Sequence, residues 1–154
     1  MKRYLIGFLG AILLFVFLAV YQNQKNSEKI ILPNYPTKTM SVGSTKITLM
    51  VPRTAREKAL GLGAVAKLPE NYGMLFSGFG QISLWMKGME YAIDIIWLDE
   101  HNEVIHSVKN AEPSSYPAIT YTNPFGTAAV AAVELSPGAI DRLGIRDGMR
   151  VGLE

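Results

Sequence analysis

The chain has 154 residues, of which 49% are hydrophobic, so it is long enough for one domain with a core plus an appendage. Lys2 and Arg3 are two of its 15 basic residues, and the remaining 13 balance the 13 Asp and Glu residues, which leaves the rest of the chain formally neutral. A neutral domain lacks the basic surface of a nucleic-acid-binding protein, and the absence of cysteine excludes disulfides and thiolate metal sites.

An apolar segment near the N-terminus predicts a membrane anchor. Residues 4–21, YLIGFLGAILLFVFLAVY, carry no charge and follow Met1-Lys2-Arg3. Their length approaches the roughly 20 residues that a helix needs to cross a bilayer. We therefore expect residues 1–22 to form a transmembrane helix with its N-terminus in the cytoplasm, and the rest of the chain to lie outside, in the periplasm or at the cell surface.

A cleaved signal peptide is the alternative, although Tyr21 and Gln22 stand where a cleavage site requires small residues. Residues 23–38 are polar, contain two prolines and have no clear period, so we interpret them as a tether. The domain itself then spans residues 39–154.

The domain is predicted to consist of short strands and two short helices. Met40 and Val42 lead into a Gly43-Ser44 turn, which indicates a hairpin over residues 39–51. Thr54 and Glu57 have the spacing of a capping box, which begins the first helix. Further strands are expected at residues 82–87, 93–98, 104–108 and 127–135, and the second helix at 136–145 with Pro137 in its first turn. Residues 77–80, SGFG, are expected to form a bend, and residues 110–124 a loop. This pattern predicts a mainly β (α+β) domain, an antiparallel sandwich or partly closed barrel with two short helices.

Two charges interrupt the most apolar stretch of the chain, Lys87 and Asp94. Side chains alternate along a strand, so Trp85 shares a face with Lys87, and Asp94 is in phase with apolar Ile96. A carboxylate on an apolar face is unfavourable unless it is paired. Asp94 is therefore expected either to pair with Lys87 or backbone amides as a structural contact, or to belong with Lys87 and Trp85 to a ligand pocket. A catalytic Asp94 is the third possibility.

Glu134 is a second carboxylate in an apolar strand, within the sequence AAVEL. If it points into the same interior as Asp94, the two carboxyl groups are placed for acid–base chemistry. The alternative is a structural contact with Arg56 or with backbone amides near the second helix. His101 and His106 have no acidic or histidine cluster at ligand spacing, so neither a metal nor a cofactor is predicted.

The order of several motifs resembles the domain of unknown function 192 family. These motifs are TAREKALGL, GMLFSGFGQISLWMKGMEYAIDIIWLDEHNEVI and VELSPGAIDRLGIRDGMRV, within residues 40–154. The resemblance implies a compact, mainly β fold that is often exported or membrane-anchored, with no established activity. The family's motif positions fall on Arg56 or Glu57, Gly61, Leu62, Gly73, Met74, Phe76, Trp85, Met86, Lys87, Asp94, Pro113, Glu134, Gly138, Gly144 and Gly148. Of these, Gly61, Gly73, Met74, Phe76, Gly138, Gly144 and Gly148 are expected to be structural.

The favoured function is a non-enzymatic, membrane-anchored binding or accessory module for a small polar ligand or an envelope component. Its candidate ligand-binding residues are Trp85, Lys87, Asp94, Glu134 and Arg56. One alternative is a hydrolase or lyase that acts on envelope carbohydrate through Asp94 and Glu134. The other is a structural partner of another membrane protein, which requires an exposed apolar patch.

Overall fold

The structure is a computed structural model that describes residues 32–114, 119–124 and 126–154. The predicted anchor at residues 4–21 and most of the predicted tether lie outside the described residues. Within the described residues, no helix is both long and apolar enough to cross a membrane.

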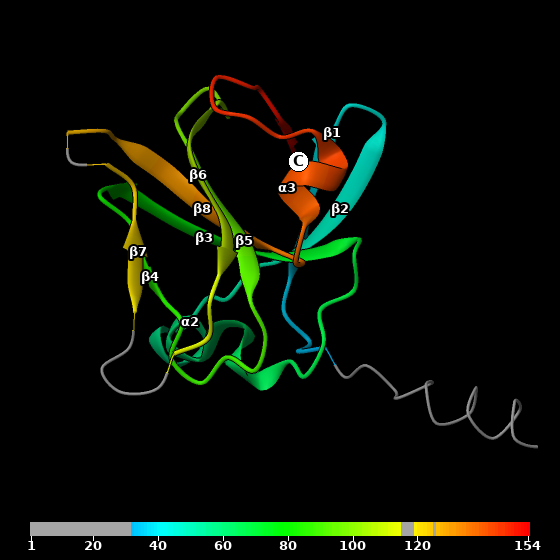
Figure 1. The fold of residues 1–154 in the computed structure, drawn as a ribbon, viewed down its shortest axis with the longest axis vertical. Coiled ribbons are helices and arrows are strands. Elements are labelled where there is room, and N and C mark those ends of the chain that lie inside the picture. Colours follow the sequence, from blue (N-terminus) through cyan, green and yellow to red (C-terminus); the bar gives the residue numbers. More distant parts are fainter. Residues whose placement is uncertain (1–31, 115–118, 125) are drawn as a thin grey trace, which may run out of the picture. The chain divides into compact units, whose positions relative to one another are not determined.

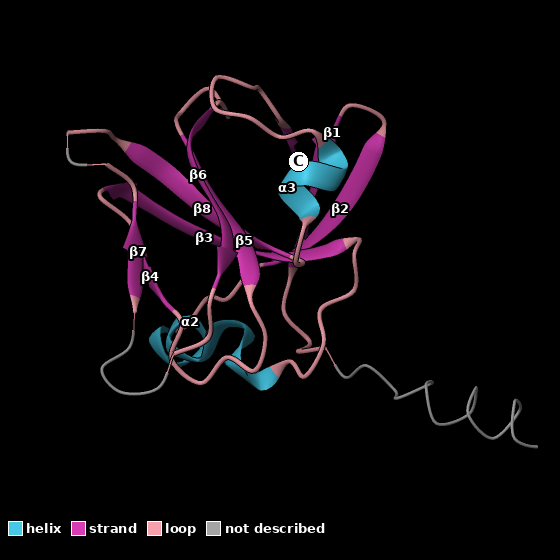
Figure 2. Cartoon of the chain, viewed as in Figure 1, coloured by secondary structure: helices cyan, strands magenta, loops and turns pink. Residues whose placement is uncertain are grey.

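The described residues form one large curled sheet, a small two-stranded sheet and two short helices (Figures 1 and 2). The large sheet has the strand order β6-β5-β8-β3-β2-β1-β9, and the small sheet pairs β4 with β7. The strands are β1 (Thr37–Val42), β2 (Thr45–Met50), β3 (Tyr72–Gly80), β4 (Ser83–Trp85), β5 (Ile93–Leu98), β6 (Val104–Ala111), β7 (Thr120–Thr122), β8 (Ala129–Leu135) and β9 (Gly152–Leu153). The helices are α2 (Ala55–Leu60), followed by the 3-10 turn η1 (Gly61–Ala64), and α3 (Ala139–Leu143).

Local signals in the sequence explain several of these elements. The predicted hairpin is confirmed as β1 and β2, which place Met40 opposite Ile47. Helix α2 begins with the predicted capping box, in which the Thr54 side chain accepts from the amide of Glu57 while the Glu57 carboxylate accepts from the amide of Thr54. Both elements depend on residues within a few positions of one another, which is why the sequence pattern identifies them.

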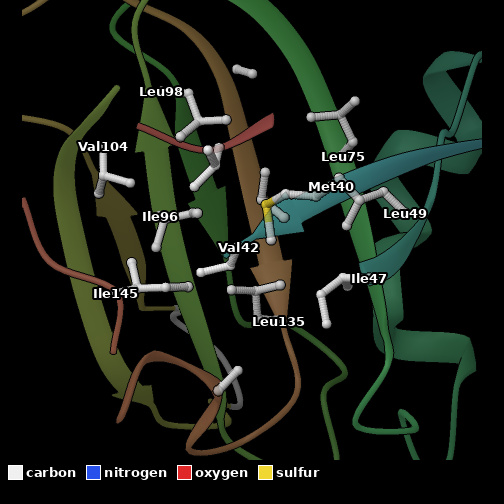
Figure 3. Packing of buried hydrophobic residues seen from close by; sticks show 14 of the residues in the cluster. Met40, Val42, Ile47, Leu49, Leu75, Ile96, Leu98, Val104, Leu135 and Ile145 are labelled. Atoms are coloured by element: carbon white, nitrogen blue, oxygen red, sulfur yellow. The ribbon is translucent and has the colours of Figure 1, made fainter. Parts of the chain in front are cut away.

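The large sheet buries side chains on both faces. One core cluster contains Leu75, Ile96 and Leu135 from the central strands (Figure 3). Ile140 of α3 belongs to the same cluster. The other contains alternate residues of the same strands, such as Trp97, and is covered by the segment after α2 and by β4. All six residues of β5 are buried because this strand lies between the two clusters.

Five details of the predicted topology were wrong. Strand β2 pairs with β3 in parallel, Thr48 opposite Tyr72, so the sheet is not purely antiparallel. Strand β4 ends at Trp85, short of Lys87, and its partner β7 lies in a segment expected to be a loop. Strand β3 continues through residues 77–80, which were expected to form a bend. Helix α3 begins at Ala139, so Pro137 precedes it rather than occupying its first turn.

Candidate functional site

A pocket of about 430 Å³ opens between the α2–η1 segment, strand β3 and strand β4. These elements are labelled in Figure 1, where α2 lies close to the end of β4. The residues that line the pocket are Lys58, Ala59, Leu60, Gly61, Leu62, Phe76, Ser77, Ile82, Ser83, Leu84, Trp85, Lys87, Met89, Thr120 and Glu134. Most of this wall is apolar, as is common in pockets that bind small organic molecules.

Glu134 is the buried polar group of the pocket. It lies on β8 between two apolar neighbours, Met74 on β3 and Ile95 on β5, and its exposed fraction is 4%. Its Oε2 atom has no hydrogen-bond partner. Burial raises the pKa of the Glu134 carboxyl to about 8, because removal from water disfavours the charged form. The group is therefore predominantly a neutral carboxylic acid at pH 7.

Gly61 leaves room beside this carboxyl group. A Cβ atom at Gly61 would lie 3.8 Å from Cζ of Phe76 and 4.0 Å from Oε2 of Glu134. The backbone of Gly61 has φ +51° and ψ −136°, a conformation that other residues rarely adopt, and it ends α2 here. The turn that terminates the helix thus brings its bare backbone next to Phe76 and Glu134.

Tyr91 is a second buried polar group near Glu134. Its hydroxyl is buried without a hydrogen-bond partner. Burial, and secondly the charge on Glu134, raise the pKa of Tyr91 to about 12. The described residues thus include two unpartnered buried oxygens in one neighbourhood, whereas most buried polar atoms in folded proteins have partners.

The other polar side chains of the pocket are exposed: the hydroxyl groups of Ser77, Ser83 and Thr120, and two cations. Lys58 projects from α2 and Lys87 follows β4, and both belong to the pocket lining. The ammonium of Lys87 lies 5.7 Å from the ring centroid of Trp85, whose side chain is 48% exposed. In the described part of the chain, neither lysine forms an ion pair within 4.0 Å. An anionic group of a ligand would therefore meet two ammonium groups that no carboxylate already neutralises.

Contacts from elsewhere in the fold fix the β4 wall. Asn123 is fully buried, and its side-chain carbonyl accepts from the amide of Ile82 at 2.7 Å. Its amide nitrogen donates to the carbonyl of Thr127 at 2.8 Å. Trp97 donates its indole N–H to the carbonyl of Ile82 at 2.9 Å. Ile82 is thus anchored to the large sheet, which positions the start of β4 beside the pocket.

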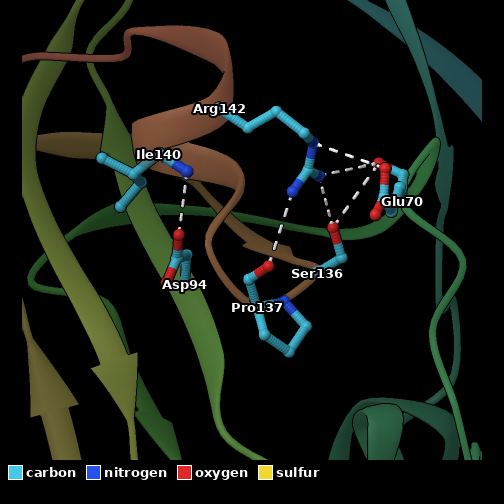
Figure 4. Close-up of polar contacts among 6 residues, drawn as sticks. All are labelled: Glu70, Asp94, Ser136, Pro137, Ile140 and Arg142. Atoms are coloured by element: carbon cyan, nitrogen blue, oxygen red, sulfur yellow. Dashed lines mark hydrogen bonds and ion pairs between the residues drawn. The ribbon is translucent and has the colours of Figure 1, made fainter.

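Asp94 does not belong to this pocket, and the expected contact with Lys87 is absent from the ion pairs of the described residues. Its carboxylate instead accepts from the backbone amide of Asn110 at 3.0 Å. It also accepts from the backbone amide of Ile140 at 2.8 Å (Figure 4). The second of the two structural alternatives, a contact between the carboxylate and the backbone, is therefore the one that the geometry shows. Asp94 connects β5 to the end of β6 and to α3.

Asp94 and Glu134 also point in opposite directions. In the β5–β8 pair, Asp94 faces Leu135 and Ile95 faces Glu134, so the two acids are one residue out of phase. Because directly opposed residues share a face and successive residues alternate, the two carboxyl groups lie on opposite faces of the sheet. The possibility that both carboxyl groups point into one interior is therefore contradicted by the register.

The remaining candidates are distributed over the fold. Arg56 is exposed on α2, outside the pocket lining, and its expected contact with Glu134 is not among the hydrogen bonds of the described residues. Met74 and Phe76 are both buried in the core, and Phe76 also lines the pocket. Gly138, Gly144 and Gly148 have positive φ angles around α3 and the turn that follows it.

A separate polar cluster holds α3 against a loop (Figure 4). In this cluster Arg142 donates to the hydroxyl of Ser136 at 2.9 Å and lies 3.7 Å from the carboxylate of Glu70.

Comparison with protein families matches residues 37–153 to the domain of unknown function 192 family, described as "Uncharacterized ACR". The chain belongs to this family. No curated protein matches the chain.

Two solved structures share the fold of this family member. A protein from Sinorhizobium meliloti 1021, described as a "putative transcription regulator", has 20% identity and a TM-score of 0.66, and the match covers 80% of this chain and 98% of that one. A protein of unknown function from Novosphingobium aromaticivorans DSM 12444 has 23% identity and a TM-score of 0.64, covering 82% of this chain and 94% of that one. At these identities the similarity concerns the fold alone.

Several of the residues that carry the resemblance to the domain of unknown function 192 family come together at the pocket. Gly61, Phe76, Trp85, Lys87 and Glu134 all line it. Sequence reasoning grouped three of them, but it missed Lys58, Leu84 and Met89. No local signal marks those three as site residues, since a lysine on a short helix is ordinarily a solvated side chain and Leu84 and Met89 are ordinary core residues.

Proposed function

We propose that this chain is a binding module that holds a small amphipathic molecule in the pocket beside Glu134, and that it acts without catalysing a reaction. The observation that carries the proposal is the unpartnered, 4% exposed carboxyl group of Glu134 in the wall of an apolar pocket. A buried polar group without a partner typically costs about 1–3 kcal/mol of stability. A ligand that supplies the missing hydrogen bond offsets this cost.

The size and chemistry of the pocket support the same role. Its volume of about 430 Å³ is within the range of about 300–1,000 Å³ typical of small-molecule sites. An indole at 48% exposure, Trp85, offers an apolar surface, and Lys58 and Lys87 offer charge. A few polar groups on a mainly apolar wall are what orient a ligand in such sites.

The hydrolase or lyase alternative has no comparable support. Glycoside cleavage ordinarily requires two carboxyl groups that flank one bond. Among the described residues that line the pocket, Glu134 is the one acid, and Asp94 lies on the other face of the sheet with both oxygens bonded to backbone amides. For this reason we favour binding over hydrolysis.

The module is further proposed to be held at the membrane, with its domain outside the cytoplasm. The support is the uncharged run at residues 4–21 after Met1-Lys2-Arg3. A reporter enzyme that is active only after export, fused after Glu154, tests this orientation. An active reporter agrees with the proposal. An inactive reporter would mean that the domain stays in the cytoplasm, which contradicts the proposal.

A ligand screen by thermal shift tests the binding role. The full-length chain is heated with a panel of sugars, nucleotides, organic acids and lipid fragments, alongside Glu134→Leu, Trp85→Ala and the surface control Lys46→Met. A ligand of the pocket raises the melting temperature of the wild type and of the control but not of the two pocket variants. If no compound stabilises the wild type, or if every stabilising compound acts equally on all four proteins, the pocket is not a binding site.

A further inference from the structure

The polar groups of the pocket lie at separate positions. Glu134 is 4% exposed, whereas Lys58 and Lys87 are exposed, and among the described residues neither lysine lies within 4.0 Å of the Glu134 carboxyl group. Lys87 instead lies over the exposed face of Trp85. The carboxyl group thus occupies the buried part of the wall and the ammonium groups occupy its exposed rim.

The buried part of the lining around Glu134 is apolar, and the hydroxyl side chains of Ser77, Ser83 and Thr120 belong to its exposed part. Leu62, Phe76 and Leu84 are at most 8% exposed, and all three line the pocket. This part of the site can accept hydrocarbon or an aromatic ring but offers no charged partner. A ligand that contacts both ends of the pocket therefore needs an apolar body with a different polar group at each end.

The two ends select different chemistry. The exposed rim carries two cations, so it attracts an anion and repels a cation. The buried end carries a carboxylic acid that is mainly protonated at neutral pH, and such a group donates one hydrogen bond and accepts others. A neutral hydroxyl or carbonyl group satisfies it without bringing another charge into an apolar environment.

We propose that the ligand is an organic anion with an apolar, ring-sized body and a neutral hydroxyl or carbonyl group at the end opposite its anionic group. The anionic group binds Lys58 and Lys87, the body packs against Phe76 and the indole of Trp85, and the neutral group hydrogen-bonds to Oε2 of Glu134. This inference rests on the proposed binding function and adds the class of ligand.

A matched series of probes tests each part of this ligand class. Phenylacetate carries only the anion, para-cresol only the hydroxyl, para-hydroxyphenylacetate both, and para-aminomethylphenylacetate has an ammonium in place of the hydroxyl. The same four patterns on a biphenyl body allow for the length of the pocket. Binding is measured by calorimetry on the full-length chain in lipid nanodiscs, with empty nanodiscs as the blank.

In the series whose length fits the pocket, the probe with both groups is expected to bind about tenfold more tightly than the probe with the anion alone. It is also expected to bind more tightly than the neutral phenol. Glu134→Leu abolishes the preference for the hydroxyl, whereas Glu134→Gln, which keeps hydrogen-bonding atoms, retains most of it. Replacing Lys58 and Lys87 together by Met abolishes the preference for the anion, and Lys46→Met changes nothing. Cooperative urea unfolding of each variant establishes that it is folded.

Three results would overturn the inference. If the ammonium-bearing probe binds most tightly, the buried end selects a cation. If the anion preference survives removal of both lysines, the rim does not bind the anion. If no probe binds but the broader thermal-shift panel yields a pocket ligand, the ligand class is wrong while the binding function stands. Absence of any ligand in both experiments removes the proposed function itself.

Discussion

The carboxylate of Asp94 accepts a hydrogen bond from the backbone amide of Ile140, 46 residues further along the chain, at 2.8 Å. Its other oxygen accepts from the amide of Asn110 at 3.0 Å, a residue with φ +53° at the irregular end of β6. One buried side chain thus holds β5, β6 and α3 together. A short helix such as α3 depends on tertiary contacts of this kind, since it cannot form stably alone.

Asp94→Asn is therefore expected to destabilise the fold. The variant keeps one acceptor oxygen but turns an NH₂ donor toward a backbone N–H, which leaves one or two buried amides unsatisfied. Hydrogen bonds to charged groups contribute about 1.5–3 kcal/mol each, so we expect the free energy of unfolding to fall by about 2–4 kcal/mol in urea titrations. The matched control is Asp141→Asn, which removes the same charge from an exposed ion pair with Lys109 and should have little effect. Equal stabilities of the two variants would show that Asp94 is not a structural contact.

Glu134 predicts a dependence of stability on pH that is opposite in sign to that of most acids. Its pKa is about 8 in the folded state against 4.5 for the ordinary value, so the folded state holds a proton that the unfolded state has released. The free energy of unfolding then falls as pH rises through this window. At about 1.4 kcal/mol per unit of pH, the loss between pH 5 and pH 8 is on the order of 4 kcal/mol.

Urea unfolding of the wild type and of Glu134→Gln at several pH values tests this dependence. The glutamine variant cannot ionise here, so the difference in unfolding free energy between the two proteins should grow in its favour from pH 5 to pH 8. The other titratable or charged groups near the carboxyl, Tyr91, Lys58 and Lys87, are the same in both proteins. A difference that does not change with pH would mean that Glu134 is hydrated and ionised in the folded state.

Gly73 is predicted to tolerate no side chain. A Cβ atom there would lie 2.7 Å from the backbone oxygen of Glu134 and 2.8 Å from Cδ2 of Leu49, and the backbone oxygen cannot move without breaking the β3–β8 pair. We expect Gly73→Ala to be insoluble, or destabilised by at least about 3 kcal/mol, because the central strands must separate. Gly78→Ala on the same strand is the control, since its Cβ would meet only the Ile82 side chain at 3.4 Å. Soluble expression and urea unfolding of the pair distinguish the two positions, and equal behaviour would contradict the close packing at Gly73.

Local sequence patterns explain the elements that were predicted correctly. The hairpin of β1 and β2, the capping box of α2 and the apolar strand β5 each depend on residues near one another in the chain. The parallel pairing of β2 with β3 and the pairing of β4 with β7 join residues that are far apart, and β7 lies in a segment without a strand pattern. Such pairings are set by tertiary packing, which overrides local preference.

The candidate site shows the same limit. Alternation along each strand correctly places Asp94 on the same face as Ile96. It cannot tell which residues of β8 share that face. That relation is fixed by the register that pairs Asp94 with Leu135, and it separates Asp94 from Glu134. Of the candidates that the sequence grouped, Trp85, Lys87 and Glu134 line the pocket, whereas Asp94 and Arg56 do not, and the place of Asp94 follows only from the register.

The ammonium of Lys87 next to the ring of Trp85 predicts selective quenching of fluorescence by an anion. The chain has two tryptophans, and Trp97 is fully buried while Trp85 is 48% exposed. Quenchers in solution should therefore act mainly on Trp85. Iodide should be the more efficient quencher because the Lys87 ammonium, 5.7 Å from the ring centroid, attracts anions to it.

Stern–Volmer titrations with iodide and with neutral acrylamide separate this attraction from simple exposure. Lys87→Met should reduce the iodide constant at low salt by about half or more and leave the acrylamide constant nearly unchanged, and added chloride should reduce the iodide effect in the wild type. Lys46→Met, which removes a surface charge on β2 away from the pocket, should alter neither constant. Trp85→Phe should remove most quenching by both agents. If Lys87→Met leaves iodide quenching intact, the lysine does not make the rim of the pocket attractive to anions.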